Sequence, residues 1–248
     1  MATWVLLRGL VREQRHWGAF VSEFHGALPD AQVVTLDLPG NGTLHAQASP
    51  THVQGMVWSC RQQLRAMGLP GPYRLLAMSM GAMVAVQWSA DHPDEVVSQV
   101  LINTSMRPVS PLHHRLRVGN YAGLLRLLLG RATDAQWERA ILRMTTNAPH
   151  EEVLAHWVQW RRQYPVSRIN ALRQLWAAAR FRVGLARPRT PTLILASRQD
   201  RLVSFQCSER LAALWQVPLR LHPTAGHDLP LDDGPWVVQQ ICHATDFL

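Results

Sequence analysis

A single serine between two apolar runs is the strongest candidate for a chemically active residue. One run ends at Met78, Ser79 follows, and the next run starts at Met80. When a strand turns at once into a helix, the turn residue takes a positive φ, and the positions two before and two after it must be small. Ala77 and Gly81 meet this requirement. Such a turn lifts the Ser79 hydroxyl clear of the sheet and directs the Met80 amide toward a developing oxyanion, so Ser79 is predicted to be a nucleophile.

A serine hydroxyl needs a general base to remove its proton, and the base needs an acid to orient it. Two later loops supply such groups. Asp200 follows the apolar run 192–196, and His227 follows the shorter run that ends at residue 221. Both residues come after predicted strand ends, and the three appear along the chain in the order Ser, Asp, His. The sequence therefore predicts a triad of Ser79, His227 and Asp200.

Around these residues the chain resembles the α/β-hydrolase family over nearly its whole length. Gly9-Leu10, after the first apolar run, resembles the oxyanion loop of that family, and residues 37–42 (DLPGNG) resemble its DxxGxG turn. The resemblance implies that the Leu10 amide is a second oxyanion donor. Two positions depart from the family pattern: Arg8 stands where many members have histidine, and Ala77 replaces the first glycine of GxSxG.

Other carboxylates must be weighed against Asp200 as the partner of His227. Asp228 is the direct neighbour of the histidine, but an adjacent acid points away and more often caps a helix, here the one expected to start at Pro235. Some relatives place the acid after the strand that here ends at Asn103, and an amide cannot be the charged orienter. Asp200 is therefore the expected partner.

Short branched apolar runs alternate with longer amphipathic stretches, which is typical of βαβ units and a mostly parallel sheet. Strands are expected at residues 3–7, 32–36, 73–77, 96–103, 192–196 and 218–221. Helices are expected at residues 13–27, 51–67, 81–89, 205–215 and 235–244. The predicted fold class is α/β: an α/β-hydrolase fold, with a mostly parallel sheet flanked by helices and a helical lid insertion.

No strand pattern occurs between residues 104 and 188, where four helices are expected, at 112–129, 134–145, 151–164 and 167–179. We therefore expect residues 1–103 to form the first part of the α/β core, 104–188 a helical lid insertion, and 189–248 the second part of the core. The insertion contains Trp137, Trp157, Trp160 and Trp176, and its apolar face is expected to cover a substrate pocket. The alternative is that these side chains only pack the insertion.

The excess positive charge of the chain lies in this insertion. Residues 104–187 hold 14 arginines and four acidic residues, whereas the rest of the chain holds 11 arginines and 13 acidic residues. Arginine is a good bidentate partner for phosphate and carboxylate. Small family members resembling the pimeloyl carrier-protein methyl ester esterase present lid arginines to their carrier protein, so Arg139 and Arg143 are candidate anion-binding residues. The alternatives are a solvated helical face and a surface that helps to bind small anionic esters.

Length and composition fit one large soluble α/β domain, with 248 residues of which 47% are hydrophobic and 17% charged. No apolar stretch reaches the roughly 18 residues of a membrane span, and no basic N-terminal segment with a cleavage site occurs. We therefore expect a cytoplasmic protein without membrane contact, as a monomer or small homo-oligomer. The scattered Cys60, Cys207 and Cys242 predict free thiols.

Metal, cofactor and nucleic-acid sites are not expected. The neighbouring His113 and His114 would face apart in a helix, which does not suit a metal site. The chain has no nucleotide-binding glycine motif, and its basic segment is not part of a recognised nucleic-acid module.

These residues suit acyl transfer, in which a serine attacks a carbonyl, an oxyanion forms and water later hydrolyses the acyl-enzyme. The expected substrate is a small-molecule carboxylic ester, cleaved without a cofactor by a carboxylesterase-like serine esterase. One alternative is an esterase or thioesterase for acyl groups on an acidic carrier protein or a phosphopantetheine arm. Another is a non-catalytic binding protein of the same fold. Carbon–carbon bond hydrolysis of diketones uses the same triad, but no residue here marks it.

Overall fold

Six short apolar segments form one sheet in the computed structural model, which describes residues 3–244. The strands are β1 (Thr3–Leu7), β2 (Gln32–Leu36), β3 (Tyr73–Met78), β4 (Val96–Ile102), β5 (Thr192–Ser197) and β6 (Leu219–His222). All pair in parallel, in the order β2-β1-β3-β4-β5-β6. The predicted α/β fold with a parallel sheet is confirmed, and each strand lies within about one residue of its expected range.

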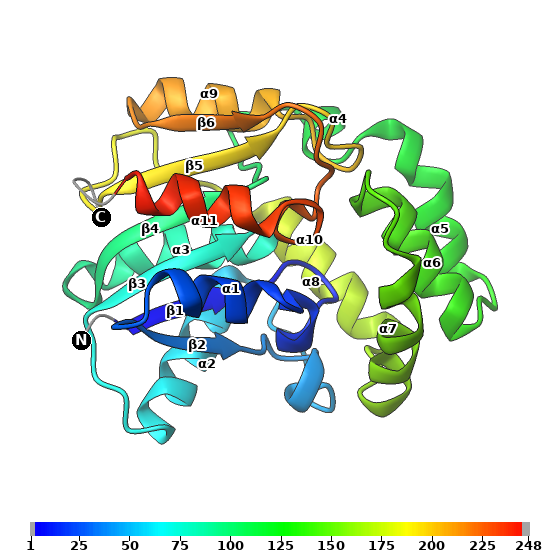
Figure 1. Ribbon diagram of the computed structural model, residues 1–248. Helices are drawn as coiled ribbons and strands as arrows, with labels where there is room; N and C mark the ends of the chain where they lie inside the picture. The colour runs from blue at the N-terminus through cyan, green and yellow to red at the C-terminus, as the bar shows by residue number, and fades with distance from the viewer. Residues whose placement is uncertain (1–2, 245–248) are drawn as a thin grey trace.

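Helices cover both faces of the sheet (Figure 1). They are α1 (Phe20–Ala27), α2 (Val53–Ala66), α3 (Met80–Asp91), α9 (Gln206–Trp215), the short α10 (Leu229–Asp232) and α11 (Gly234–Cys242). Side chains of a strand alternate between the faces. Val5 and Leu75 therefore join one buried cluster with α2, α3 and α9, whereas Leu6 and Leu76 join another with α1 and α11. The sheet is thus the rigid centre of the molecule.

Between β4 and β5 the described chain is mainly helical. We call α4–α8 the helical segment: α4 (Leu112–Arg115), α5 (Tyr121–Leu129), α6 (Asp134–Thr145), α7 (Glu151–Gln163) and α8 (Arg168–Arg180). A β-bridge between Arg107 and Arg182 joins the stretches of chain that enter and leave it. Figure 1 shows α5, α6 and α7 standing beyond the end of the sheet where the strand arrows point.

Two predicted helices are interrupted. The expected helix 112–129 stops at Arg115, because that side chain turns inward to donate to the Ala178 and Ala179 carbonyls, and α5 starts only at Tyr121. The expected helix 13–27 is a 3₁₀ turn, η1 (Gln14–Trp17), followed by α1, since Gly18 has a φ of 55°. In both places the amphipathic pattern correctly indicates helix, but a contact or a backbone conformation that the pattern does not encode interrupts it.

The three cysteines are free thiols, as the sequence predicts. Cys60 and Cys207 are buried and Cys242 is partly buried, and none forms a disulfide. Burial raises the pKa of the Cys60 thiol to about 12, so it stays protonated.

Within residues 3–244, no helix has the length and apolar character needed to cross a membrane.

The sheet order reverses direction between β1 and β3. After β1 the chain places β2 on one side, and from β3 onward it adds strands on the other side. Loops that leave the carboxyl ends of strands at such a switch point diverge and leave a crevice, which is where open α/β sheets bind ligands. The loop after β1 and the turn after β3 meet there.

Candidate active site

The turn between β3 and α3 holds Ser79 in a strained backbone conformation. Its φ is 55° and its ψ is −116°, and its amide donates to the Ile102 carbonyl of the adjacent strand at 2.8 Å. A β-carbon at Gly81 would lie 2.5 Å from the Leu7 carbonyl oxygen, so only glycine fits. A β-carbon at Gly9 would lie 3.0 Å from that of Ser79. The serine turn and the loop after β1 are therefore in close backbone contact.

Asp200 and His227 form a buried hydrogen-bonded pair. Asp200 Oδ2 and His227 Nδ1 are 2.7 Å apart, and the residues are 1% and 3% exposed. The other aspartate oxygen accepts the amides of Leu202 and Val203 at 2.8 and 2.9 Å, which fixes the carboxylate. Nδ1 is thus engaged and Nε2 is the nitrogen left for Ser79. In the described part of the chain the serine and the histidine line one cavity without a hydrogen bond between them.

Asn103 holds the histidine loop from behind. Its Nδ2 donates to the His227 carbonyl at 2.8 Å and to the Gly226 carbonyl at 3.2 Å, while its Oδ1 accepts the Ser197 amide at 2.8 Å. Its φ of 46° is one that asparagine adopts more readily than most residues. Sequence reasoning used Asn103 only to exclude a second acid and missed its role in joining β4, β5 and the histidine loop.

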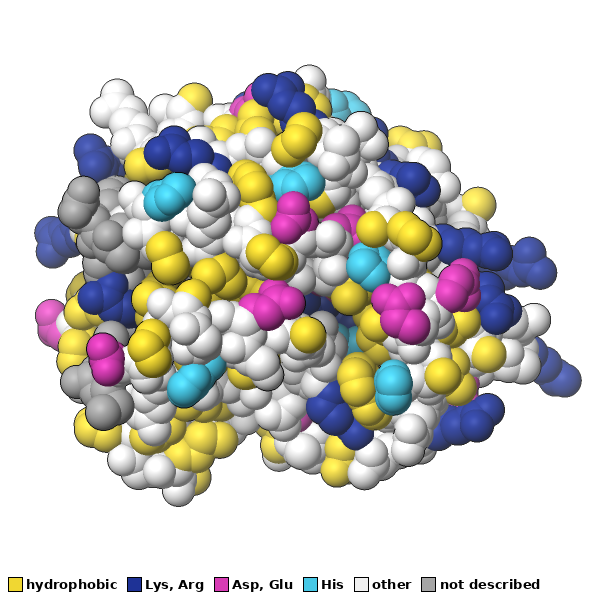
Figure 2. All heavy atoms as spheres, in the orientation of Figure 1, with side chains coloured by type: hydrophobic (Ala, Val, Ile, Leu, Met, Phe, Trp, Pro, Cys, Tyr) yellow, Lys and Arg dark blue, Asp and Glu magenta, His cyan; other side chains and the backbone are white. Residues whose placement is uncertain are grey.

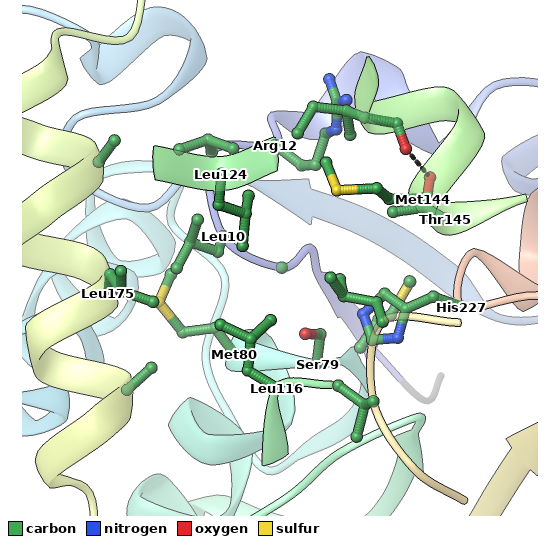
Figure 3. Close-up of a pocket in the computed structure, with 18 of the residues that line it drawn as sticks. Leu10, Arg12, Ser79, Met80, Leu116, Leu124, Met144, Thr145, Leu175 and His227 are labelled. Carbon is green, nitrogen blue, oxygen red and sulfur yellow. Dashed lines mark hydrogen bonds between the residues drawn. The ribbon is translucent and has the colours of Figure 1, made fainter. Parts of the chain in front are cut away.

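The loop after β1 forms a tight turn beside Ser79. The Arg12 amide donates to the Gly9 carbonyl at 3.3 Å, and Val11 has a φ of 54°, which is rare for a β-branched residue. Leu10, in the middle of the turn, lines the same cavity as Ser79 (Figure 3). The residue predicted to supply the second oxyanion donor is thus next to the candidate nucleophile.

Arg8 and Asp228 form a buried ion pair that sequence reasoning missed. The two guanidinium nitrogens donate to the two carboxylate oxygens at 3.0 and 2.5 Å, and both residues are 2% exposed. The guanidinium also lies 4.9 Å from the Trp17 ring. The expectation that Asp228 caps the last helix is wrong, because Asp233 accepts the Trp236 amide there. The pair joins the loop after β1 to the residue that follows His227.

A cavity of about 190 Å³ lies above Ser79 (Figure 3). Met80 also lines it, and as the first residue of α3 it has an N–H group with no partner inside the helix. Aliphatic side chains of the helical segment form much of the remaining wall: Leu116, Leu124, Leu127, Ile141, Met144 and Leu175. The cavity therefore offers an apolar group a place directly next to the serine.

The four tryptophans predicted to cover a pocket have different surroundings. Trp137 lines the cavity. Trp157 and Trp160 pack their rings edge-on against His16, at 5.2 and 5.3 Å between centroids, and lie outside the cavity wall. Trp176 is 55% exposed and does not line the cavity. The prediction therefore needs correction at three positions, because tryptophan content alone does not show which side of a helix faces the core.

Polar side chains join the loop after β1 to the helical segment. Arg12 donates to Glu138 at 2.6 Å and contacts His16 Nε2 at 2.9 Å, and its guanidinium lies 4.3 Å from the Trp157 ring. Burial lowers the pKa of His16 well below its ordinary value, and the nearby Arg12 charge lowers it further. His16 is therefore neutral near pH 7, and adding a proton there would oppose folding.

Arg139 and Arg143, predicted to bind anions, are exposed on α6 one turn apart and lie outside the cavity wall. Figure 2 shows basic side chains gathered on the end of the molecule where α5–α7 lie. Among residues 3–244 no group of three or more His, Cys, Asp or Glu side chains could hold a metal ion.

Comparison with known proteins places this site in a family. Residues 4–240 match the model of the "Alpha/beta hydrolase family". The chain belongs to the α/β-hydrolase family, in agreement with the resemblance seen in the sequence. A thermophilic esterase from Thermogutta terrifontis has a similar solved structure, with a TM-score of 0.77, 21% identity, and coverage of 98% of this chain and 89% of the other. At that identity the likeness concerns the fold alone.

Two curated proteins are similar in sequence. A protein named "Putative carbamate hydrolase RutD" from Pseudomonas savastanoi pv. phaseolicola is 28% identical over 246 residues, which covers 92% of this chain and 88% of that protein. The biotin biosynthesis bifunctional protein BioHC from Teredinibacter turnerae is 30% identical over 102 residues, 41% of this chain and 17% of that protein. The similarity to these relatives supports the assignment of this chain as a hydrolase. The two relatives are named for different activities, so they do not define the substrate.

Proposed function

We propose that this protein is a serine hydrolase that cleaves carboxylic esters through an acyl-enzyme. One observation carries the proposal. His227, 2.7 Å from its buried partner Asp200, lines the same cavity as Ser79, whose backbone has a φ of 55°. A base oriented by a carboxylate, at the same cavity as a hydroxyl, is the arrangement that nucleophilic acyl transfer requires.

In the first half of the proposed reaction, Ser79 Oγ bonds to the ester carbonyl carbon while His227 Nε2 takes the hydroxyl proton. The Leu10 and Met80 amides donate to the resulting oxyanion. The tetrahedral intermediate then collapses, the bond to the alcohol oxygen breaks, and the imidazolium returns its proton to the departing alcohol. Throughout, Asp200 keeps the imidazole in one tautomer and stabilises its charged form.

In the second half, His227 takes a proton from water, and the hydroxide oxygen bonds to the acyl carbon. Collapse of this second intermediate releases the carboxylic acid and returns the proton to Ser79. The reaction consumes one water for each ester. Its steps use the side chains of Ser79, His227 and Asp200 together with the Leu10 and Met80 amides.

The cavity wall supports an apolar substrate group. Many of its aliphatic side chains come from the helical segment. The charged residues of the lining have partners of their own: Arg8 pairs with Asp228, Arg12 with Glu138, and Arg115 with the Ala178 carbonyl. Burying an acyl chain there releases about 25 cal/mol for each Å² of apolar surface removed from water. We therefore expect butyryl and octanoyl esters to be better substrates than acetyl esters.

A panel of p-nitrophenyl esters with acetyl, butyryl, octanoyl and palmitoyl chains tests the proposal. Wild-type protein should show the highest kcat/KM for a chain of intermediate length, and Ser79→Ala should remove the activity while leaving the thermal unfolding temperature nearly unchanged. Activity that persists in Ser79→Ala would rule out this nucleophile. A folded wild-type protein with no turnover of any ester would instead favour a non-catalytic binding role.

A carbamate belongs in the same panel, because the relative that matches most of this chain is named for carbamate hydrolysis. The same serine chemistry applies to a carbamate carbonyl. A small carbamate would leave the aliphatic wall without a partner, so we expect it to be the poorer substrate. A higher kcat/KM for the carbamate than for every ester would reverse the assignment.

The second candidate is an esterase or thioesterase for acyl groups on an acidic carrier protein. The exposed pair Arg139 and Arg143 favours it, as does the partial similarity to BioHC. Replacing both arginines by alanine should raise KM for a carrier-linked ester at least severalfold and leave KM for a p-nitrophenyl ester unchanged. Equal effects on the two substrates would argue against a carrier protein.

A further inference from the structure

One helix of the helical segment holds the backbone of the predicted oxyanion loop. Gln174 lies in α8 and is 0% exposed. Its Oε1 accepts the amide of Val11 at 2.9 Å, across 163 residues of chain. Helix α8 is therefore in direct contact with the turn that carries Leu10, and its contribution is more specific than a wall of apolar side chains.

The same side chain is fixed from its other end. Gln174 Nε2 donates to Asn41 Oδ1 at 2.8 Å and to Ser49 Oγ at 3.0 Å, and its contact with the Pro39 carbonyl is 3.5 Å. Asn41, also 0% exposed, donates through Nδ2 to the Arg12 carbonyl at 2.9 Å. Gln174 and Asn41 together thus hold the turn after β1 on both sides of Val11.

The turn needs such support because of the residue type at its strained position. Val11 has a φ of 54°, a conformation that glycine adopts freely and that a β-branched side chain strongly disfavours. An amide without a partner in a buried site is also costly, and Gln174 supplies the acceptor for this one. Without that acceptor, Val11 is free to relax toward negative φ, which reorients the Leu10–Val11 peptide and loosens the preceding Leu10 amide.

We infer that Gln174 is a positioning residue for catalysis, which keeps the Leu10 amide directed at the oxyanion by holding Val11 at positive φ. The inference rests on the proposed function, since it concerns the oxyanion donor of that reaction. It assigns to α8 a part in rate acceleration that differs from substrate selection. The effect should therefore fall on kcat and on binding of a transition-state analogue, with little effect on KM.

Gln174→Met tests the inference, because it keeps the approximate length of the side chain and removes the acceptor. Loss of a whole oxyanion donor costs about 10²- to 10³-fold in kcat. For a donor that is loosened, kcat should fall about 10- to 100-fold, with KM within about twofold. Affinity for a boronic acid analogue should fall in parallel with kcat.

Asn170→Leu is the matched control. Asn170 lies one turn earlier on α8, is also buried, and joins the helix to the Ser49 amide and the Gln47 carbonyl, both at 2.9 Å, without touching the oxyanion loop. This substitution should leave kcat within about threefold. Equal losses of kcat in Gln174→Met and Asn170→Leu would mean that α8 acts only by docking, and would overturn the inference.

Val11→Gly provides a rescue experiment. Glycine adopts the positive φ without strain, so the turn should keep its shape without the acceptor. In the Val11→Gly background, Gln174→Met should therefore lower kcat by less than about threefold. An undiminished loss in that background would overturn the inference. Should Gln174→Met fail to fold, Gln174→Glu keeps an oxygen for the Val11 amide, and its kcat should exceed that of Gln174→Leu.

Hydrogen exchange at the Val11 amide separates this inference from the proposed function. The amide should exchange at least tenfold faster in Gln174→Met than in Asn170→Leu, and this readout needs no substrate. If the wild-type protein is inactive on every ester but its Val11 amide is protected, the esterase proposal is wrong, whereas the role of Gln174 in holding the loop stands. If the wild-type protein is active but the Val11 amide exchanges at the same rate in Gln174→Met and Asn170→Leu, Gln174 does not hold the loop.

Discussion

The sheet with its flanking helices and the helical segment differ in how they treat apolar side chains. The sheet and its flanking helices bury most large ones, although Trp58 on α2 is 62% exposed. The helical segment leaves more of them in solvent, including Leu125 at 57%, Leu129 at 73% and Ile169 at 70%. Residues 104–187, which contain the helical segment, also carry 14 of the 25 arginines of the chain. The difference indicates that the α/β core, which is well packed, positions the proposed catalytic residues. The helical segment, which forms much of the cavity wall, is packed less completely.

The largest expected effects come from the proposed triad in the α/β core. His227→Ala should lower kcat for a p-nitrophenyl ester by about 10⁶-fold, and Asp200→Asn by about 10⁴-fold, because removing the base costs more than removing the group that orients it. Asp134→Asn on α6 is the control, with kcat expected within about twofold. Full activity of Asp200→Asn would transfer the acid role to another carboxylate and weaken the contrast between the two regions.

The next contrast compares an ion pair from each region. Arg8→Ala leaves the Asp228 carboxylate buried without its partner, which should reduce the free energy of unfolding by about 3–5 kcal/mol. Arg162, whose side chain is 70% exposed, lies 3.8 Å from Asp134, and Arg162→Ala should cost less than about 1 kcal/mol. Urea unfolding measures both. Similar small losses would show that the buried pair is no more important for folding than a surface pair.

Two leucines on α5 sharpen the comparison within the helical segment. Leu127 is 6% exposed and lines the cavity, whereas Leu129 is 73% exposed. Leu127→Ala should lower the free energy of unfolding by about 2 kcal/mol and shift the preferred acyl chain to a longer one, because it enlarges the cavity. Leu129→Ala should change stability by less than about 0.5 kcal/mol and leave the preference unchanged. The ester panel would contradict this view of the wall if both variants kept the same optimum.

The smallest effect concerns pH at the contact between the two regions. Because the pKa of His16 is lowered in the folded state, the unfolded chain binds an extra proton as pH falls through about 6.5, so stability should be lost below that pH. The loss should be at most about 1.4 kcal/mol for each pH unit. His16→Gln should remove this part of the pH dependence, measured by urea unfolding at pH 7.5 and 5.5, whereas His25→Gln on the exposed side of α1 should not. An unchanged slope in His16→Gln would contradict the assignment.

Much of this arrangement could be predicted because it depends on local pattern. The strands coincide with short runs of branched apolar residues. The turn at Ser79 requires glycine at position 81, because a larger residue there would collide with the Leu7 carbonyl. Asp200 and His227 could be selected because each follows a strand. Parallel strands bring such positions to one edge of the sheet, so residues far apart in sequence could be assigned to one site.

The remaining features depend on pairs that no local pattern reports. Arg8 and Asp228 are separated by 220 residues, and each by itself indicates only an unusual loop residue or a helix cap. Gln174 lies within one of the predicted helices, and nothing in its neighbourhood in the sequence indicates that its partner is a backbone amide 163 residues earlier. A valine at a positive φ was the least predictable feature, because its conformation is supplied by those distant contacts and opposes its intrinsic preference.

The turn between α5 and α6 has a consequence for how the site could be assembled. A break in the chain at Gly130, which precedes the exposed Arg131, would put Leu10 and Ser79 on one fragment and Asp200 and His227 on the other. The fragments would share the sheet boundary between β4 and β5, where Asn103 joins Ser197. Neither fragment alone would hold a nucleophile and its base. Ester cleavage by a mixture of the two would therefore report their reassociation, which makes this chain a candidate for a split reporter.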